Sequence, residues 1–168
     1  NNTAVGAASL SANTTGDVNT AVGSNALAAN TTGSSNTAVG YHALDANTTG
    51  TQNVAIGRAS LTSATTADNN TGCGKDTLHN TTTGNDNTAV GFAALTSNTT
   101  ASYNVAVGSN CLDACTTGEK NVAIGYGALT DSTTARYQVA IGYEALANQT
   151  TAQSGAVAIG YQCLYTSN

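Results

Sequence analysis

The sequence contains no proline, methionine or tryptophan, and it has few charged or large apolar side chains. Its nine acidic and four basic residues give a net charge of −5 without a basic cluster, which argues against nucleic-acid binding. No apolar run approaches the roughly 18 residues of a membrane span, so membrane insertion is not expected. Leu, Ile, Val and Phe number only 26 of 168 residues, too few to fill one large globular core.

Small residues take the place of the missing types. Ala and Thr supply 30 residues each, Asn 20 and Gly 18, so these four types make up more than half of the chain. Such a composition allows two interpretations: an unstructured Thr/Asn/Gly chain, or a thin fold whose core is small everywhere.

An internal repeat of 17 residues favours the thin fold. The segment Asn19–Gly23 returns at Asn36–Gly40 and at Asn53–Gly57, and the last interval has one extra residue near Ser154 and Gly155. We interpret residues 1–168 as a single array of ten repeats, the tenth incomplete, and as a piece of a longer protein. The repeats start at Asn2, Asn19, Asn36, Asn53, Asn70, Asn87, Asn104, Asn121, Gln138 and Ala156.

Each residue type keeps a fixed place within the repeat, whose positions we number from 1, at the Asn, to 17. Gly occupies repeat position 5 and Leu repeat position 9 in all ten copies. Nine of the fifteen Val and Ile residues occupy repeat position 4 and five occupy repeat position 2, which leaves only Val18 elsewhere. A Thr-Thr pair follows the Leu in nine copies.

This pattern predicts an all-β fold, a parallel β-solenoid with one coil per repeat. Repeat positions 2 to 4 alternate Thr/Val, Ala and Val/Ile with the period of a strand, and the Gly permits a positive φ or a close backbone approach. The Thr-Thr segment has turn character. At about 4.8 Å per coil, ten coils would form a rod of roughly 48 Å.

Stacking of the coils would align identical residues along the rod. We expect the Asn side chains of repeat position 1 to form a hydrogen-bonded ladder, and the Leu and Val/Ile columns to form a narrow core. The expected core residues are Val22, Leu27, Val39, Leu44, Ile56, Leu61, Val90, Leu95, Val107, Leu112, Ile124, Leu129, Ile141, Leu146, Ile159 and Leu164. The expected strand-ending glycines are Gly23, Gly40, Gly57, Gly91, Gly108, Gly125, Gly142 and Gly160.

Repeats such as Asn121–Tyr126 and Gln138–Tyr143 resemble those of YadA-type trimeric autotransporter adhesin heads. Similar arrays occur in bacteriophage tail fibres and in large repetitive bacterial surface proteins. The resemblance covers the whole chain and implies a left-handed parallel β-roll, a homotrimer, interior Val/Ile and Ala positions, and a role in surface attachment. The repeats of adhesin heads are typically shorter, and the additional Thr-Thr-Gly turn favours the phage-fibre branch or a related filament.

No arrangement of residues points to catalysis, a metal or a cofactor. His42 and His79 occupy non-equivalent repeat positions without metal-ligand spacing. Cys73, Cys111 and Cys163 replace small or core residues and are expected to be buried. Cys115 lies four residues after Cys111, so a local disulfide is an alternative in an oxidising compartment.

The aromatic side chains are the candidate surface-binding residues. Tyr can stack on a sugar face or anchor a protein partner, whereas in a second interpretation it shields the corner of a coil or fills a seam between chains. Repeat position 6 and the last repeat position hold Tyr41, Phe92, Tyr103, Tyr126, Tyr137, Tyr143 and Tyr161.

Three functions follow from these features. The first is an extracellular structural and adhesive fibre, on a virion tail or a bacterial surface, which meets a glycan or protein receptor. The second is a purely structural filament subunit that assembles end to end. The third is an ice-binding solenoid, which would need a flat outward array of Thr side chains.

Overall fold

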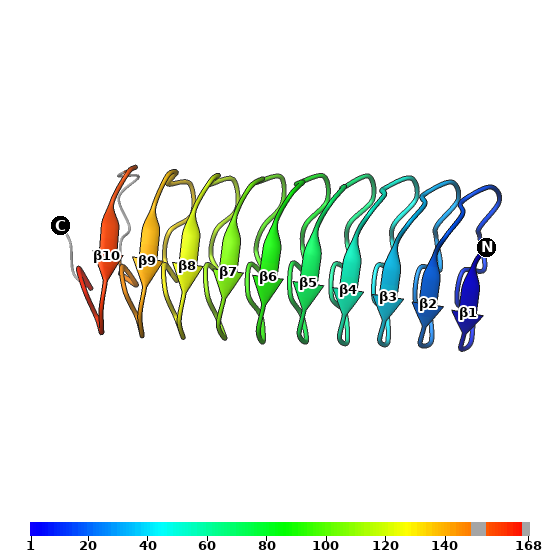
Figure 1. Cartoon of the computed structure of the whole chain (residues 1–168), viewed down its shortest axis with the longest axis horizontal. Helices are drawn as coiled ribbons and strands as arrows, with labels where there is room; N and C mark the ends of the chain where they lie inside the picture. The colour runs from blue at the N-terminus through cyan, green and yellow to red at the C-terminus, as the bar shows by residue number, and fades with distance from the viewer. Residues whose placement is uncertain (149–153, 166–168) are drawn as a thin grey trace.

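The computed structural model describes residues 1–148 and 154–165, and it confirms the parallel β-solenoid. One short strand per coil joins a single ten-stranded parallel sheet, in the order of the sequence (Figure 1). The strands are β1 (Thr3–Val5), β2 (Thr20–Val22), β3 (Thr37–Val39), β4 (Val54–Ile56), β5 (Thr71–Cys73), β6 (Thr88–Val90), β7 (Val105–Val107), β8 (Val122–Ile124), β9 (Val139–Ile141) and β10 (Val157–Ile159).

Register between coils follows the repeat. Ala21 pairs with Ala38 and Ala38 with Ala55, one repeat apart. The pairing of Val139 with Val157 keeps this register although the interval is 18 residues, so the extra residue is absorbed between β9 and β10. Every described coil therefore presents equivalent positions at the same place on the rod.

The interior of each coil is filled by Leu and Ala. Leu27, Leu44, Leu61 and their equivalents as far as Leu146 are fully buried, and so is the strand Ala from Ala21 to Ala158. At Gly72, which replaces this Ala, an added Cβ would lie 3.6 Å from Leu61 Cδ1. The core is therefore a column of Leu side chains packed against a column of methyl groups.

The predicted Val/Ile half of the core is wrong. Val39, Ile56, Val90, Val107 and Ile124 are 36–42% exposed in this single chain, and Ile159 is 66% exposed. Val22 and Ile141 are partly exposed. The reason is the space inside the coil: Leu from the opposite wall leaves room for a methyl group only, so Ala faces inward and its two neighbours on the strand face outward.

Two further burial predictions are corrected. Cys73 shares repeat position 4 and is exposed like the Val and Ile residues of that column. Leu164 is 48% exposed, because no described coil covers it on the side away from β9. Of the other predicted buried thiols, Cys111 is buried and Cys163 is partly exposed.

The glycine of repeat position 5 behaves as predicted. Gly23 has a φ of +138°, and a Cβ added there would lie 2.4 Å from the carbonyl oxygen of Gly40. Neither the conformation nor the contact admits a side chain. The other seven predicted glycines also have positive φ.

The Asn ladder of repeat position 1 is present and buried. Asn104 Oδ1 accepts the backbone N–H of Asn121 at 3.0 Å, while Asn104 Nδ2 donates across the coil to the Gly118 carbonyl at 2.9 Å. Each Asn thus joins neighbouring coils and both walls of its own coil. In the last two repeats this position is occupied by Gln138 and Ala156 instead of Asn.

A second buried Asn column, at repeat position 12, is interrupted. Asn47 Nδ2 donates to Asn30 Oδ1 at 2.8 Å, but Asn47 Oδ1 has no hydrogen-bond partner. The next residue in this column is Ala64, which has no donor. The unsatisfied oxygen of Asn47 is therefore a defect caused by drift of the repeat.

Replacing one member of the first ladder should destabilise the fold. Asn104→Ala leaves the Asn121 N–H and the Gly118 carbonyl without these partners, at about 1–3 kcal/mol for each unsatisfied group. Chemical unfolding at matched protein concentration measures the loss, with the exposed Thr100→Ala as control. Equal stability of the two variants would contradict a stabilising role for the ladder.

Repairing the second column should stabilise the fold. Ala64→Asn supplies a side-chain amide to Asn47 Oδ1, and we expect a gain of about 1 kcal/mol in the free energy of unfolding. Thermal and chemical unfolding measure it. Ala29→Asn, at a partly exposed position, is the control. A loss of stability specific to Ala64→Asn would show that the interior has no room for the amide.

Candidate functional site

The candidate aromatic residues all lie on the surface, at least 44% exposed. Only three of them come together: Tyr126, Tyr143 and Tyr161 stack in consecutive coils, with ring centroids 5.4 Å apart and planes 12–13° from parallel. Tyr41 and Phe92 occupy the same repeat position 6, but in distant coils, and Arg58 and other residues lie between them in this column. The Tyr stack is thus the one extended aromatic surface among the described residues.

The second aromatic column, at repeat position 17, is mixed. Lys120 lies between Tyr103 and Tyr137, with its Nζ 5.3 Å from the centroid of the Tyr137 ring. In the first column, at repeat position 6, Lys75 Nζ similarly lies 5.2 Å from the centroid of the Phe92 ring. These cations interrupt the aromatic faces and place positive charge beside them.

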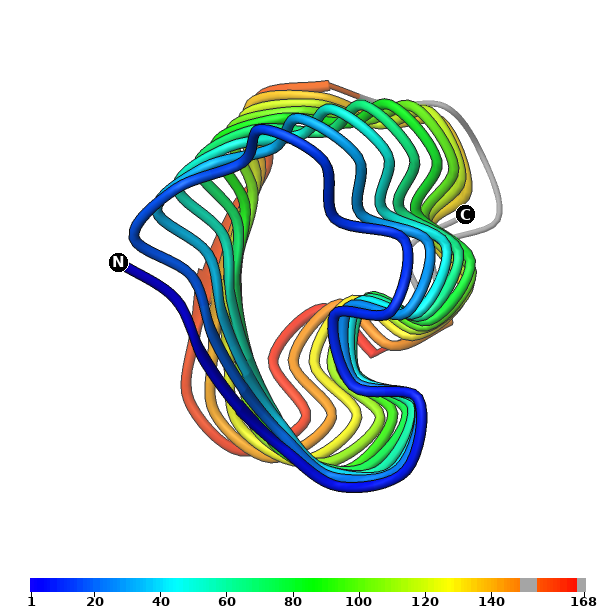
Figure 2. The same cartoon turned by 90° about the vertical axis from the view of Figure 1, so that its right-hand side faces the viewer.

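Two cavities lie along an indented wall of the rod that we call the groove, and one of them is lined by Tyr126 of the Tyr stack. Viewed along the axis, each coil is indented on the wall opposite the strand (Figure 2). Two residues of this segment have a left-handed backbone, at repeat positions 7 and 9, as at Asn25 with a φ of +58° and the buried Leu27 with a φ of +52°. Repeat positions 7 and 10 stand on the two sides of the indentation, as the linings of the two cavities demonstrate.

Hydrogen bonds cross or border the groove in several coils. Near the N-terminal end, His42 Nδ1 pairs with Asp45 Oδ2 at 2.5 Å, and its Nε2 lies 3.2 Å from Asn25 Nδ2. The hydroxyl of Thr130 donates to the Gly127 carbonyl at 2.6 Å. The groove is therefore a structured feature rather than a gap between loose turns.

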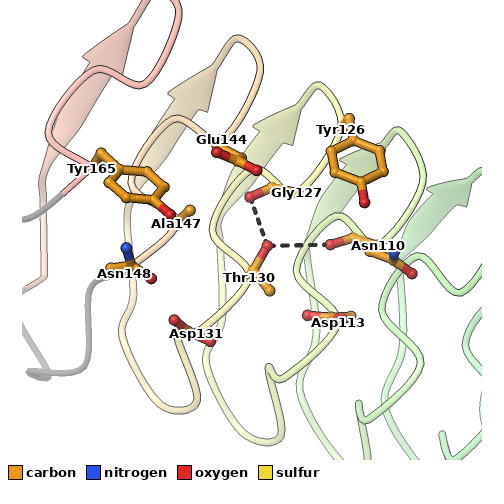
Figure 3. A pocket seen from close by; sticks show the side chains of 10 residues that line it. All are labelled: Asn110, Asp113, Tyr126, Gly127, Thr130, Asp131, Glu144, Ala147, Asn148 and Tyr165. Atoms are coloured by element: carbon orange, nitrogen blue, oxygen red, sulfur yellow. Dashed lines mark hydrogen bonds between the residues drawn. The ribbon is translucent and has the colours of Figure 1, made fainter.

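The first cavity, which we call the acidic cavity, spans the coils that follow β7 to β10 and has a volume of about 300 Å³ (Figure 3). Tyr126 and Tyr165 lie at its opposite ends, and Asp113 and Asp131 lie along one side. Its main polar and aromatic lining residues are Asp113, Asp131, Glu144, Thr130, Tyr126 and Tyr165.

The lining of the acidic cavity contains no Lys, Arg or His, so its carboxylates are not paired with a cation there. Asp113 Oδ1 is buried and has no hydrogen-bond partner. Burial raises the pKa of Asp113 above its usual value, and the nearby charge of Asp131 raises it further. Glu144 Oε2 accepts a hydrogen bond from Gln162 Nε2 at 2.9 Å. The Glu144 carboxylate also accepts from the Tyr143 hydroxyl and so raises the pKa of Tyr143.

The second cavity, of about 380 Å³, lies in the same groove nearer the N-terminus. Here Asp76 pairs with Arg58 at 3.8 Å and with Lys75 at 3.3 Å. Its acidic group is therefore compensated by neighbouring cations, in contrast to the acidic cavity.

The remaining candidate residues have structural surroundings. All four cysteines are free thiols, so the local disulfide is absent from the described residues. Burial raises the pKa of Cys111 to about 12 and that of Cys115 to about 11. His79 Nδ1 lies 3.3 Å from the Ala59 carbonyl oxygen. Residues 1–148 and 154–165 contain no group of three His, Cys, Asp or Glu that could hold a metal.

The Thr-Thr pairs form one outward rank, not a flat double array. The first Thr of each pair bonds the backbone, as when Thr31 Oγ1 donates to the Thr48 carbonyl at 2.9 Å. The second, such as Thr100, is exposed. On the strands, Thr shares its column with Val, so the described coils present no continuous Thr-x-Thr surface for ice.

The groove was not predicted from the sequence. A signal was present, because Asn110, Asp113, Asp131 and Glu144 gather at polar repeat positions of three consecutive repeats. It could be interpreted only once the structure had placed repeat positions 7 and 10 on the two sides of the indentation.

Comparison with models of protein families, with curated proteins and with solved structures finds no match for this chain. The described residues include no helix with the length and hydrophobicity of a membrane span.

Removing the charge of Asp113 should change the pH dependence of stability. Because its pKa is raised in the folded state, folding stability falls as pH rises from the unfolded pKa through the raised folded pKa. Asp113→Asn should therefore be more stable than the parent at pH 7 and similar to it at pH 3. Thermal unfolding at both pH values measures this, with exposed Asp86→Asn as control. Parent-like stability of Asp113→Asn at pH 7 would contradict the burial argument.

Proposed function

We propose that this chain is a stiff segment of an extracellular fibre, on a virion tail or a bacterial surface, that associates laterally with copies of itself and presents a binding face. The observation that carries the proposal is the outer face of the sheet. There Thr or Val at repeat position 2 and Val or Ile at repeat position 4 form what we call the aliphatic strip.

The aliphatic strip is long, regular and uncharged. It takes two positions from each of ten strands, and none of them is Asp, Glu, Lys or Arg. At the usual strand spacing it measures on the order of 40 Å by 10 Å, or about 400 Å². This equals the largest apolar patches that monomeric proteins expose, and such patches mark interaction surfaces.

A second and third copy of the chain are the partners that suit this surface best. The strip repeats at the spacing of the coils, so an identical strip offers ridges and hollows of the same period. Three strips facing a common axis would bury the exposed Val and Ile, and the resemblance to adhesin heads implies the same number of chains. The groove lies on the opposite wall and would stay accessible in such a trimer (Figure 2).

A purely structural filament subunit is the second candidate. The same strip favours it, because lateral burial of Val and Ile strengthens a rod whether or not the rod meets a receptor. The two functions differ only in the binding face, and ligand binding separates them.

Charge placed in the aliphatic strip should dissociate the assembly. We expect the parent to have the solution mass of a trimer, and Val107→Lys to reduce it to that of a folded monomer, since buried like charges repel. Light scattering after size exclusion gives the mass, and circular dichroism checks the fold. Exposed Thr117→Lys, outside the strip, should keep the parent mass. A parent that is a folded monomer would overturn lateral assembly.

A further inference from the structure

The acidic cavity differs from the second cavity in the charges that line it. In the second cavity Asp76 is paired with two cations, whereas the lining of the acidic cavity includes three carboxylates and no Lys, Arg or His. The same fold therefore produces two hollows, and only the acidic cavity has carboxylates in its lining without a cation beside them.

The carboxylate acceptors of the acidic cavity favour a ligand with several hydrogen-bond donors. Asp113 lines the cavity without a cation beside it, and the exposed part of its carboxylate can accept a hydrogen bond from a ligand there. Asp131 lies on the same side as Asp113, and Glu144 lies across from them (Figure 3). Ionised carboxylates only accept hydrogen bonds, and their summed charge repels anions in a partly enclosed site.

The remaining lining groups add two further requirements. Asn110 and Asn148 contribute amides that both donate and accept, so a ligand with groups of both kinds satisfies them best. Tyr126 and Tyr165 close the two ends of the cavity with aromatic rings (Figure 3). Such rings favour a ligand that also has apolar C–H surface.

From these groups we infer that the acidic cavity binds a sugar unit that is either uncharged or carries an amino group. Sugar hydroxyls donate to Asp113 and Asp131 and accept from the amides, while the C–H surface of the ring rests against the tyrosines. The cavity volume of about 300 Å³ is at the lower end for small-molecule sites and suits one end or branch of a glycan.

A basic peptide is the competing ligand, and the lining disfavours it. A Lys side chain offers donors but no acceptor, so only the backbone carbonyls of the peptide could accept from the amides of Asn110 and Asn148, whereas each sugar hydroxyl both donates and accepts. An acidic sugar is disfavoured more strongly, because its carboxylate would face those of Asp113, Asp131 and Glu144.

This inference deepens the adhesive part of the proposed function, and it does not depend on the number of chains, since the groove and the aliphatic strip occupy opposite walls. Tyr126 also begins the stack with Tyr143 and Tyr161. Further units of a bound glycan can therefore continue along an aromatic surface that starts at the cavity.

The test is a glycan array with neutral, amino and uronic-acid or sialylated glycans, followed by calorimetric titration of the best binder. We expect neutral or amino glycans to bind the parent. Asp113→Asn and Tyr126→Ala should each weaken binding at least tenfold, because one loses a charged acceptor and the other a ring. Tyr41→Ala, at the same repeat position far from the cavity, should bind like the parent.

The solution mass and circular dichroism of every variant are measured in the same samples. Loss of binding with unchanged mass and fold supports the site. A parent whose solution mass is not that of a trimer contradicts the proposed assembly but leaves the sugar site unaffected. The sugar site is overturned by preference for acidic glycans, by equal binding of tri-lysine, by an array without binders, or by parent-like affinity of both cavity variants.

Discussion

The structure depends on the exchange of hydrogen bonds between equivalent positions of successive coils. A coil of 17 residues cannot bury enough apolar surface to satisfy its own interior, so its polar groups find partners one repeat away. The Asn column is the clearest example, because each side chain bonds the backbone of the next coil and the far wall of its own. A constant register between coils follows from this requirement, since a shift in register would separate every such pair.

Much of this arrangement could be predicted from the sequence. The period gave one coil per repeat, the Gly column marked a positive φ, and the recurring Asn indicated a ladder. Which strand face points inward could not be decided, because alternation defines two faces without assigning either to the core. The answer depends on Leu27 and its equivalents, which fill the coil from the opposite wall and leave space only for Ala. Similarly, the groove accompanies left-handed backbone at repeat positions 7 and 9, and the Leu of position 9 gives no sequence signal for this conformation.

The two walls of the rod have opposite characters. The strand wall is uncharged over its whole length, with Thr, Val, Ile and one Cys facing outward, whereas the groove wall varies from coil to coil in charge and aromatic content. Variation is tolerated on the groove wall because repeat positions 7 and 10 bond neighbouring coils through their backbone N–H and C=O groups, which do not depend on the side chain. A repetitive scaffold can therefore hold a site at one place along its length without weakening the rest.

Strand register across the 18-residue interval between β9 and β10 shows where the repeat tolerates a change in length. A single extra residue between β9 and β10 leaves their pairing unchanged, and gain or loss of a whole 17-residue unit would leave all pairings intact. Duplication or deletion of such a unit in the gene would lengthen or shorten the rod by about 4.8 Å per step. The reach of the molecule is thus a heritable quantity that can vary independently of the chemistry of its surface.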